Sequence, residues 1–320
     1  MKKKGSFSAG YHDSPVLWKQ HLVRALEEDQ FQYDWTTLGI TNITRRVTAQ
    51  VVAKSAGVWA SQGLVLAANA LAIELGWDLQ IRMNPRLQVG DRFSPGVHLC
   101  NWVGEAHAVL RLERAFLNLA AYASGIAYKT RGMIEQIEHT WRDRGYSPQP
   151  PRLTSTRKTL PGYRDVSVLA VMAGGGQSHR VSLGAGVLIK ENHIAAAGGI
   201  GAAILGARKV APHGLRIEIE VRNLKELEVA LAQGVDAVLL DNFQPAEVAR
   251  AIEVIESRRH GLVTVEVSGG IDSRNLEAFL LPGVHVISSG GLTHSVQVTD
   301  LSLLIDWKKP RSSKSKRSKR

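Results

Sequence analysis

The second half of the chain repeats one pattern, a short apolar run that ends in a polar residue and is followed by an amphipathic stretch of helical length. After an opening RLTST, the runs are VLIK, RIEIEV, DAVLLD, VTVEVS and HVISS, with amphipathic stretches at 224–233, 245–256 and 273–281. Their last polar residues, Lys190, Glu220, Asp241, Ser268 and Ser289, follow one another at intervals of 30, 21, 27 and 21 residues. Each interval fits one strand–helix unit. The pattern predicts a parallel sheet covered on both faces, closed into a barrel or open and doubly wound.

Polar residues at successive strand ends predict a site at one rim of this sheet. Glu220 and Asp241 each end an apolar run, where a carboxylate is costly unless it binds a cation or a sugar hydroxyl. A salt bridge inside the barrel, with Lys190 or Lys158, is the alternative and is compatible with the first interpretation.

The stretch 154–194 gathers fixed cations at predicted strand ends and glycine turns. These cations are Arg157, Lys158, His179, Arg180 and Lys190. Arginine suits planar recognition of carboxylate or phosphate, whereas lysine acts as a point charge. Any one of them could be a solvated surface charge, but as a group they predict a polyanionic ligand.

Two glycine turns follow the last two predicted strands. They are Ser268-Gly269-Gly270 and Ser288-Ser289-Gly290-Gly291, and Asp272-Ser273 after the first is typical of a helix start. Backbone N–H groups at such turns bind phosphate, so we expect a phosphate subsite here. A turn that needs glycine for backbone reasons alone is the competing interpretation.

The first half predicts an α+β layer. An amphipathic helix is expected at 15–28 after a loose segment 1–15, then β-favouring runs at 48–53, 57–61, 79–83 and 107–110, with a helix at 65–76. A long helix follows at 113–137, and the polar, proline-rich segment 141–152 is a linker. We therefore expect an N-terminal domain at 16–140, a catalytic domain at 141–306 and a disordered basic tail at 307–320.

Composition narrows the class of protein. The 320 residues, 44% of them hydrophobic, suffice for a sizeable core. Of 40 Lys and Arg residues, three lie at 2–4 and eight in the tail, so the body balances 29 cations against 29 acids despite the net charge of +11. The single cysteine, Cys100, excludes an intrachain disulfide. No export signal or membrane segment is evident, which predicts a cytoplasmic protein.

Several strings resemble the signature of the quinolinate phosphoribosyltransferase family, also called carboxylating nicotinate-nucleotide pyrophosphorylases. They are TRKTLPGYR, GGGQSHR and LIKENHIAAAGGI, with further matches in LERAFLNLAAYASGIA, IEIEV, LLDN, VEVSGGI and SSGGLTHSV. The resemblance covers about residues 40 to 306, in order. The sequence departs from the family pattern at Asn42, Ser178 and Glu191, where the family usually has Asp, Asn and Asp.

The resemblance implies a fold and an assembly. The N-terminal α+β sandwich would cover the mouth of an incomplete, seven-stranded α/β barrel, with the C-terminal end of the barrel domain able to pack back on the first domain. The active sites would be shared within a homodimer, which in the family is sometimes tripled to a hexamer. Arg114 would reach the partner subunit's site, although a surface arginine paired with Glu113 explains the residue equally well.

The resemblance also implies an activity. The enzyme would convert quinolinate and phosphoribosyl pyrophosphate to nicotinate mononucleotide, pyrophosphate and CO₂ in NAD biosynthesis. Glu220 and Asp241 would hold Mg²⁺, directly or through water, and the ribose hydroxyls. Substrate-binding residues would be Thr156, Arg157, Lys158, His179, Arg180, Lys190, Ser268, Gly269, Gly270, Ser288, Ser289, Gly290 and His294, with Arg114 from the partner. Lys158, on the pyrophosphate, would join Lys190, Glu220 and Asp241 as catalytic residues.

Three other functions stay open. Lys190 at a strand end could act as an amine nucleophile in a Schiff-base lyase. A relative of the same fold, of the type found with molybdate-transport genes, could act on another anion. The basic tail could bind nucleic acid through counterion release, although the neutral body argues against a specific nucleic-acid partner.

Overall fold

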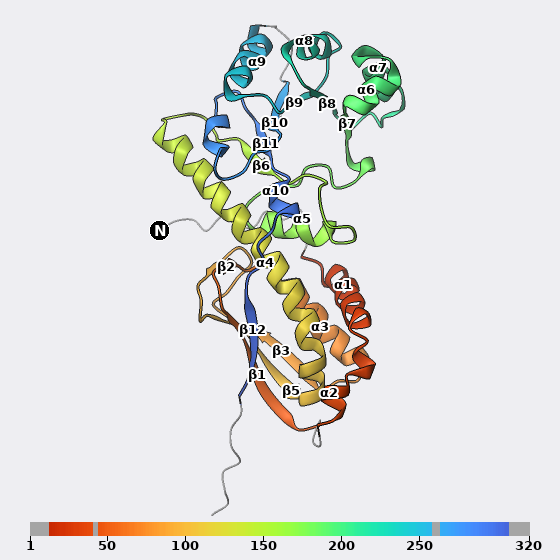
Figure 1. Cartoon of the computed structure of the whole chain (residues 1–320), viewed down its shortest axis with the longest axis vertical. Coiled ribbons are helices and arrows are strands. Elements are labelled where there is room, and N and C mark those ends of the chain that lie inside the picture. Colours follow the sequence, from red (N-terminus) through yellow and green to blue (C-terminus); the bar gives the residue numbers. More distant parts are fainter. Residues whose placement is uncertain (1–12, 41–43, 258–262, 307–320) are drawn as a thin grey trace, which may run out of the picture.

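The structure, a computed structural model, describes residues 13–40, 44–257 and 263–306. Its lower part in Figure 1 is a sheet layered with helices, and its upper part is an α/β unit. The long helix α4, Ala106–Asp143, runs through both parts.

The lower part is built on an antiparallel sheet of order β12-β1-β5-β3. Its strands are β1 Arg46–Ala53, β3 Leu79–Met83, β5 His98–Glu105 and β12 Leu301–Ile305. Helices α1 Pro15–Glu28, α3 Gln62–Glu74 and α4 pack against one another, and α3 and α4 also contact strands of this sheet (Figure 1). Strand β12 returns from the far end of the chain to pair with β1, from Ala49 opposite Ile305 to Ala53 opposite Leu301.

Small elements complete this part. The 3₁₀ helix η1 Phe31–Tyr33 and helix α2 Trp35–Leu38 follow α1, and the short strands β2 Gly57–Val58 and β4 Arg92–Phe93 pair with each other. The Asp34 side chain caps α2 by accepting from the Thr37 N–H at 3.1 Å.

The prediction of a strand at 107–110 is wrong, because those residues lie in the first turns of α4. Val109, Leu112 and Phe116 are buried at helical spacing, so the helical pattern begins earlier than the predicted start at 113. The strand in this region is β5. Its alternation of apolar and polar residues is weak in the sequence, because Asn101 and Gly104 interrupt it. At its other end α4 extends to Asp143, into the predicted linker.

The upper part is a six-stranded sheet of order β6-β11-β10-β9-β8-β7, parallel throughout as predicted. The strands are β6 Arg152–Thr154, β7 Val187–Ile189, β8 Ile217–Val221, β9 Ala237–Asp241, β10 Thr264–Ser268 and β11 Val286–Ser288. Beside β6, a single parallel bridge joins Thr154 to Gln177 at the seventh strand position. Within the described residues, the expected seventh strand is therefore one bridge, and the barrel is incomplete.

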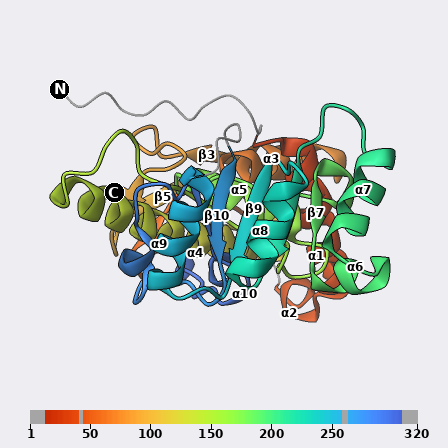
Figure 2. The same cartoon turned by 90° about the horizontal axis from the view of Figure 1, so that it is seen from above.

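Helices alternate with these strands. They are α5 Arg164–Ala173, α6 Glu191–Ala197, α7 Ile200–Val210, α8 Leu224–Ala232, α9 Pro245–Ser257 and α10 Gly291–His294, with 3₁₀ turns η2 Leu183–Ala185 and η3 Leu276–Phe279. Figure 2 shows α8 and α9 over the face of β9 and β10. The helix predicted at 273–281 is only η3. Asp272 accepts from the Arg274 N–H and Asn275 Oδ1 accepts from the Asp272 N–H, and this turn delays the helical start.

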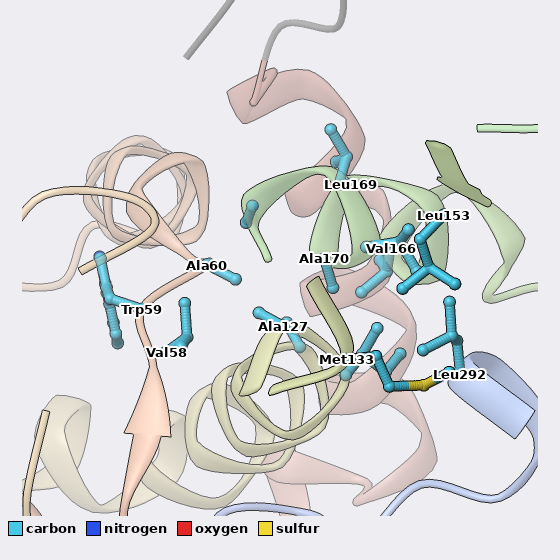
Figure 3. Close-up of a cluster of buried hydrophobic side chains, with 14 of the residues drawn as sticks. Val58, Trp59, Ala60, Ala127, Met133, Leu153, Val166, Leu169, Ala170 and Leu292 are labelled. Atoms are coloured by element: carbon cyan, nitrogen blue, oxygen red, sulfur yellow. The ribbon is translucent and has the colours of Figure 1, made fainter. Parts of the chain in front are cut away.

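One buried cluster joins the two parts (Figure 3). Trp59 of the lower part, Ala127 and Met133 of α4, and Val166 of α5 are each at most 2% exposed. Leu153 of β6 and Leu292 of α10 complete the cluster from the barrel side. Because apolar burial is continuous across the junction, the barrel rim is held rigidly against the lower part.

Candidate active site

A cavity of about 270 Å³ lies at the carboxyl ends of the barrel strands. Ten residues predicted to bind substrate line it, namely Thr156, Arg157, Lys158, His179, Arg180, Lys190, Glu220, Asp241, Ser268 and Ser288. These residues are spread along the chain from Thr156 to Ser288. The fold, and not their spacing in the sequence, therefore brings the side chains together. Leu188, Leu239 and Glu266 complete the lining.

Lys190 and Glu220 form an ion pair across neighbouring strands. Lys190 directly follows β7, Glu220 lies near the end of β8, and Lys190 Nζ donates to Glu220 Oε2. The Glu220 side chain is 10% exposed and that of Lys190 is 44% exposed. The salt bridge considered from the sequence is therefore present, and it compensates the charge of a nearly buried carboxylate.

His179 lies between the buried carboxyl group of Glu266 and the partly buried one of Glu218, two acids that the sequence did not single out. Its Nε2 is 3.3 Å from Glu218 Oε2 and 3.2 Å from Glu266 Oε2. A signal for both acids was available. Glu218 shares one face of β8 with Glu220, and Glu266 shares one face of β10 with Ser268, because every second residue of a strand points the same way.

Opposing effects set the protonation of this cluster. Burial alone would lower the pKa of His179, but its contacts with Glu218 and Glu266 raise it overall. On the other side of the ring, the Arg180 N–H donates to His179 Nδ1 at 2.7 Å. Burial, followed by the charge of Glu266, raises the pKa of Glu218 despite its contact with His179.

Arg157 and Arg180 place two guanidinium groups beside each other in the cavity. Burial and then the charge of Arg157 lower the pKa of Arg180. The Nε atoms of both residues are buried with no hydrogen-bond partner among the described residues. Like charges held together in this way destabilise the empty site, and a bound dicarboxylate would relieve the repulsion and use the unpaired donors.

The two glycine turns do not reach the cavity lining beyond Ser268 and Ser288. Gly269 has a φ of +104°, and a Cβ there would lie 2.3 Å from Asn242 Oδ1, so packing explains this glycine. The Asn275 side chain donates to the Gly270 carbonyl at 3.0 Å, and the buried Ser289 hydroxyl donates to the Ile271 carbonyl at 2.6 Å.

The turn at Gly290 nevertheless lies against one cavity residue. A Cβ on Gly290 would lie 3.0 Å from His294 Cδ2 and 3.2 Å from Lys158 Cδ. Thr293 Oγ1 also donates to the Lys158 carbonyl at 2.8 Å. The exposed His294 and Lys158 thus flank one glycine turn, although His294 does not line the cavity.

Arg114 lies outside the cavity of its own chain. Its side chain, on α4, is 64% exposed and its Nη2 is 3.9 Å from Glu113 Oε1. This distance is too long for a strong ion pair, so the guanidinium remains available for other contacts. Its role in a partner subunit's site stays a prediction.

Two of the three departures from the family pattern, Ser178 and Glu191, fall outside this cavity. Asn42 lies outside the described residues. Ser178 faces a second cavity, described below, and Glu191 is the first residue of α6, with Oε2 3.3 Å from Arg222 Nη1. The basic tail at 307–320 is also outside the described residues.

Fold and cavity together define an α/β-barrel enzyme that binds a small polyanion, with clustered cations facing two carboxylates at the carboxyl rim. Models of two family domains match the chain: the N-terminal domain of quinolinate phosphoribosyl transferase at residues 34–124 and its C-terminal domain at 126–304. The chain belongs to the quinolinate phosphoribosyl transferase family.

Relatives and solved structures agree. The human nicotinate-nucleotide pyrophosphorylase [carboxylating] is 36% identical over 78% of this chain and 81% of its own length. The Mycobacterium leprae enzyme of the same name is 35% identical over 88% of this chain and 94% of its own. The structure of NadC from Streptococcus pyogenes superposes with a TM-score of 0.81 at 31% identity, covering 94% of this chain and 100% of that one. Within the described residues, no helix is long and apolar enough to cross a membrane.

Proposed function

We propose that this protein is a quinolinate phosphoribosyltransferase, which converts quinolinate and phosphoribosyl pyrophosphate to nicotinate mononucleotide, pyrophosphate and CO₂. The observation that carries the proposal is the convergence of Arg157, Arg180 and Lys190 with Glu220 and Asp241 on one cavity. The two substrates are both multiply anionic, and the ribose between the reacting groups becomes cationic as pyrophosphate leaves.

The cations divide between the two substrates. Arg157, Arg180 and His179 lie together, and their donors match the two adjacent carboxylates of quinolinate. Lys158, beside the Gly290 turn, is placed for the phosphate groups of the second substrate, and we assign the 5-phosphate to the nearby serine and glycine turns. Thr156 and Ser288 supply hydroxyl groups within the same lining.

Glu220 and Asp241 fit a magnesium ion. Glu220 lies near the end of β8 and Asp241 ends the neighbouring strand β9. Both line the cavity, and carboxylate oxygens are the ligands Mg²⁺ prefers. Mg²⁺ bound there would neutralise the pyrophosphate charge as it develops. Independently of the ion, these two carboxylates face the ribose and stabilise its oxocarbenium-like transition state.

The chemistry needs no covalent enzyme intermediate. The pyridine nitrogen forms a bond to ribose C1 as the bond from C1 to pyrophosphate breaks. The ring now carries a positive charge, so the bond to the 2-carboxylate breaks easily and leaves its electron pair on the ring carbon. The clustered cations stabilise that carbanion until a proton replaces the CO₂.

Arg114 extends the proposal to a dimer. We assign its exposed guanidinium to the quinolinate subsite of the partner subunit, so that each site is complete only in the homodimer. This assignment accounts for an arginine on α4 whose ion pair within the described residues, with Glu113, is as long as 3.9 Å.

The decisive assay supplies the purified protein with quinolinate, phosphoribosyl pyrophosphate and Mg²⁺ and measures nicotinate mononucleotide. Nicotinate in place of quinolinate should give no product, because it lacks the second carboxylate that the arginine pair binds. Product from nicotinate alone would identify a different phosphoribosyltransferase. Borohydride trapping of a keto substrate on Lys190 would instead support the lyase, an outcome that the pairing of Lys190 with Glu220 disfavours.

A further inference from the structure

A second cavity, of about 630 Å³, opens at the opposite mouth of the barrel. Arg152, Ala237 and Thr264, at the amino ends of their strands, line this lower cavity. It shares His179, Arg180 and Glu266 with the active-site cavity, so one layer of side chains separates the two. The interior of a parallel barrel is usually filled by branched apolar side chains, and a polar interior that opens at both ends calls for an explanation.

Glu266 is the acid in this dividing layer. It is 3% exposed, and its Oε2 lies 3.2 Å from His179 Nε2. Its Oε1 is buried and has no hydrogen-bond partner among the described residues. Thr154, 5% exposed, lines the lower cavity with an Oγ1 that likewise lacks a partner in the described chain. Unpaired buried oxygens are costly, so water or substrate must satisfy them.

The cluster suits a proton better than a metal. Ligand atoms of His179, Glu218 and Glu266 lie within 4.8 Å of one another, a spacing that could hold a cation. However, the Arg180 N–H donates to Nδ1, which assigns the ring proton to Nε2, the nitrogen that faces the carboxylates. A metal ion on Nε2 would need that proton removed, whereas an Nε2–H beside two carboxyl groups is a ready hydrogen-bond network that can hold a further proton.

We propose that Glu266 is a further catalytic residue, the acid that protonates the ring carbon after CO₂ leaves, and that water in the lower cavity restores its proton. The inference rests on the proposed function. The bond from ring carbon to carboxylate breaks, CO₂ leaves, and the electron pair stays on carbon. The O–H bond of Glu266 then breaks as the C–H bond forms, and the Glu266 carboxylate takes a proton from solvent.

The position of the second substrate favours this route. Once quinolinate and phosphoribosyl pyrophosphate fill the active-site cavity, water is excluded from the upper rim. Lys190 and Glu220 are paired with each other at that rim, whereas Glu266 touches both cavities. The lower mouth remains as the path to solvent, and its size and polar lining allow it to hold water.

The test separates the two chemical stages in a single turnover. Glu266→Gln keeps the shape of the side chain but cannot supply the acid. We expect this variant to bind quinolinate and to release pyrophosphate at the wild-type rate, while nicotinate mononucleotide forms on the order of 10²-fold more slowly. Equal slowing of both products, or wild-type rates for both, overturns the proposal.

A second variant tests the proton supply independently of Glu266. Thr154→Val should leave the first turnover unchanged but slow later turnovers several-fold and raise the solvent deuterium isotope effect. Thr130→Val is the matched control, because this buried hydroxyl donates to the Ile126 carbonyl at 2.8 Å and lines neither cavity. If Glu266→Gln does not fold, a wild-type isotope effect in Thr154→Val decides against the proposal. Wild-type protein that makes no nicotinate mononucleotide would instead refute the proposed function.

Discussion

The amide Nδ2 of Asn242 donates a hydrogen bond to Oδ2 of Asp241 at 2.7 Å. Asn242 adopts a left-handed backbone with a φ of +57°, and its N–H donates to the Ser268 carbonyl at 2.9 Å. On its other side, Gly269 leaves room for Asn242 Oδ1, which an added Cβ would approach to 2.3 Å. Asn242 is thus held between two strand ends, and it orients the carboxylate assigned to magnesium and ribose.

We predict that Asn242→Ala weakens use of phosphoribosyl pyrophosphate and leaves quinolinate binding unchanged. A hydrogen bond to a charged group contributes roughly 1.5–3 kcal/mol, so kcat/KM for this substrate should fall about 10- to 100-fold. Phosphoribosyl pyrophosphate should raise the melting temperature of the protein in the presence of Mg²⁺, and the Mg²⁺ concentration that gives half of this rise should be higher in the variant. Steady-state kinetics and thermal shift with each substrate measure the two effects.

Asn223→Ala is the control for this change. Asn223 follows the neighbouring strand β8 and caps α8 by accepting from the Glu226 N–H at 2.9 Å. Its loss should lower stability by about 1 kcal/mol without changing either substrate's KM. A quinolinate KM that rises in Asn242→Ala as much as the other KM would show general damage to the rim.

Glu220→Gln should reduce turnover at least about 100-fold while the protein stays folded. The amide keeps the size of the side chain but removes the charge that stabilises the ribose cation and pairs with Lys190. Quinolinate affinity should be unchanged or higher, because Lys190 is released from its ion pair. Calorimetric titration with quinolinate, beside turnover, measures both.

Asp241→Asn provides the matched comparison, since Asp241 lies on the next strand and lines the same cavity. Near-normal turnover in either variant would remove that residue from the mechanism. Unfolding at unchanged denaturant concentration would show that the loss of turnover is chemical rather than structural.

The sequence predicted the rim of the barrel well because each strand there leaves two signals in the sequence. An apolar run such as Val187–Ile189 marks the strand, and the polar residue after it, Lys190, marks the end that faces the cavity. Parallel pairing then brings such ends to one edge, which is why residues far apart in the chain could be grouped.

The interior of the barrel was harder to predict. Glu218 and Glu266 lie within strands, and only the period of 2 reveals that they point inward with Glu220 and Ser268. The reason for Gly269 was also hidden, because Asn242, which occupies the space beside it, is distant in the sequence. Long-range packing of this kind leaves no local signal.

Mixed subunits can test the assignment of Arg114 to the partner's site. Arg114→Ala and Lys190→Ala dimers should each be nearly inactive, since every site lacks one substrate-binding cation. Re-pairing the two by mild unfolding and refolding should restore about a quarter of wild-type activity, because half of random dimers carry one intact site of two.

Arg142→Ala, near the end of the same helix, is the matched control and should be fully active on its own. If mixing restores no activity, Arg114 acts within its own chain or has no part in the reaction. Activity in Arg114→Ala close to wild type would leave the residue as an ordinary surface charge.

The raised pKa of His179 predicts how stability depends on pH. The folded-state pKa lies above the unfolded value of about 6.5, so the stabilisation by the protonated ring is fully present below that value. It is lost as pH rises through the folded-state pKa. The raised pKa of Glu218 has the same sign, because ionising that buried carboxyl at higher pH also destabilises the folded state.

We therefore expect the wild type to lose its stability advantage over His179→Gln between about pH 6.5 and about pH 10, measured as the free energy of unfolding in urea. The glutamine can still donate to the carboxylates but does not titrate. His98→Gln, at an exposed position on β5, is the control, because it removes a histidine that has no part in this cluster. If the difference in unfolding free energy between wild type and His179→Gln does not change with pH, the prediction is wrong. The Arg180 N–H would then keep the His179 ring neutral throughout, and the carboxylates would act on the ring only through the Nε2–H.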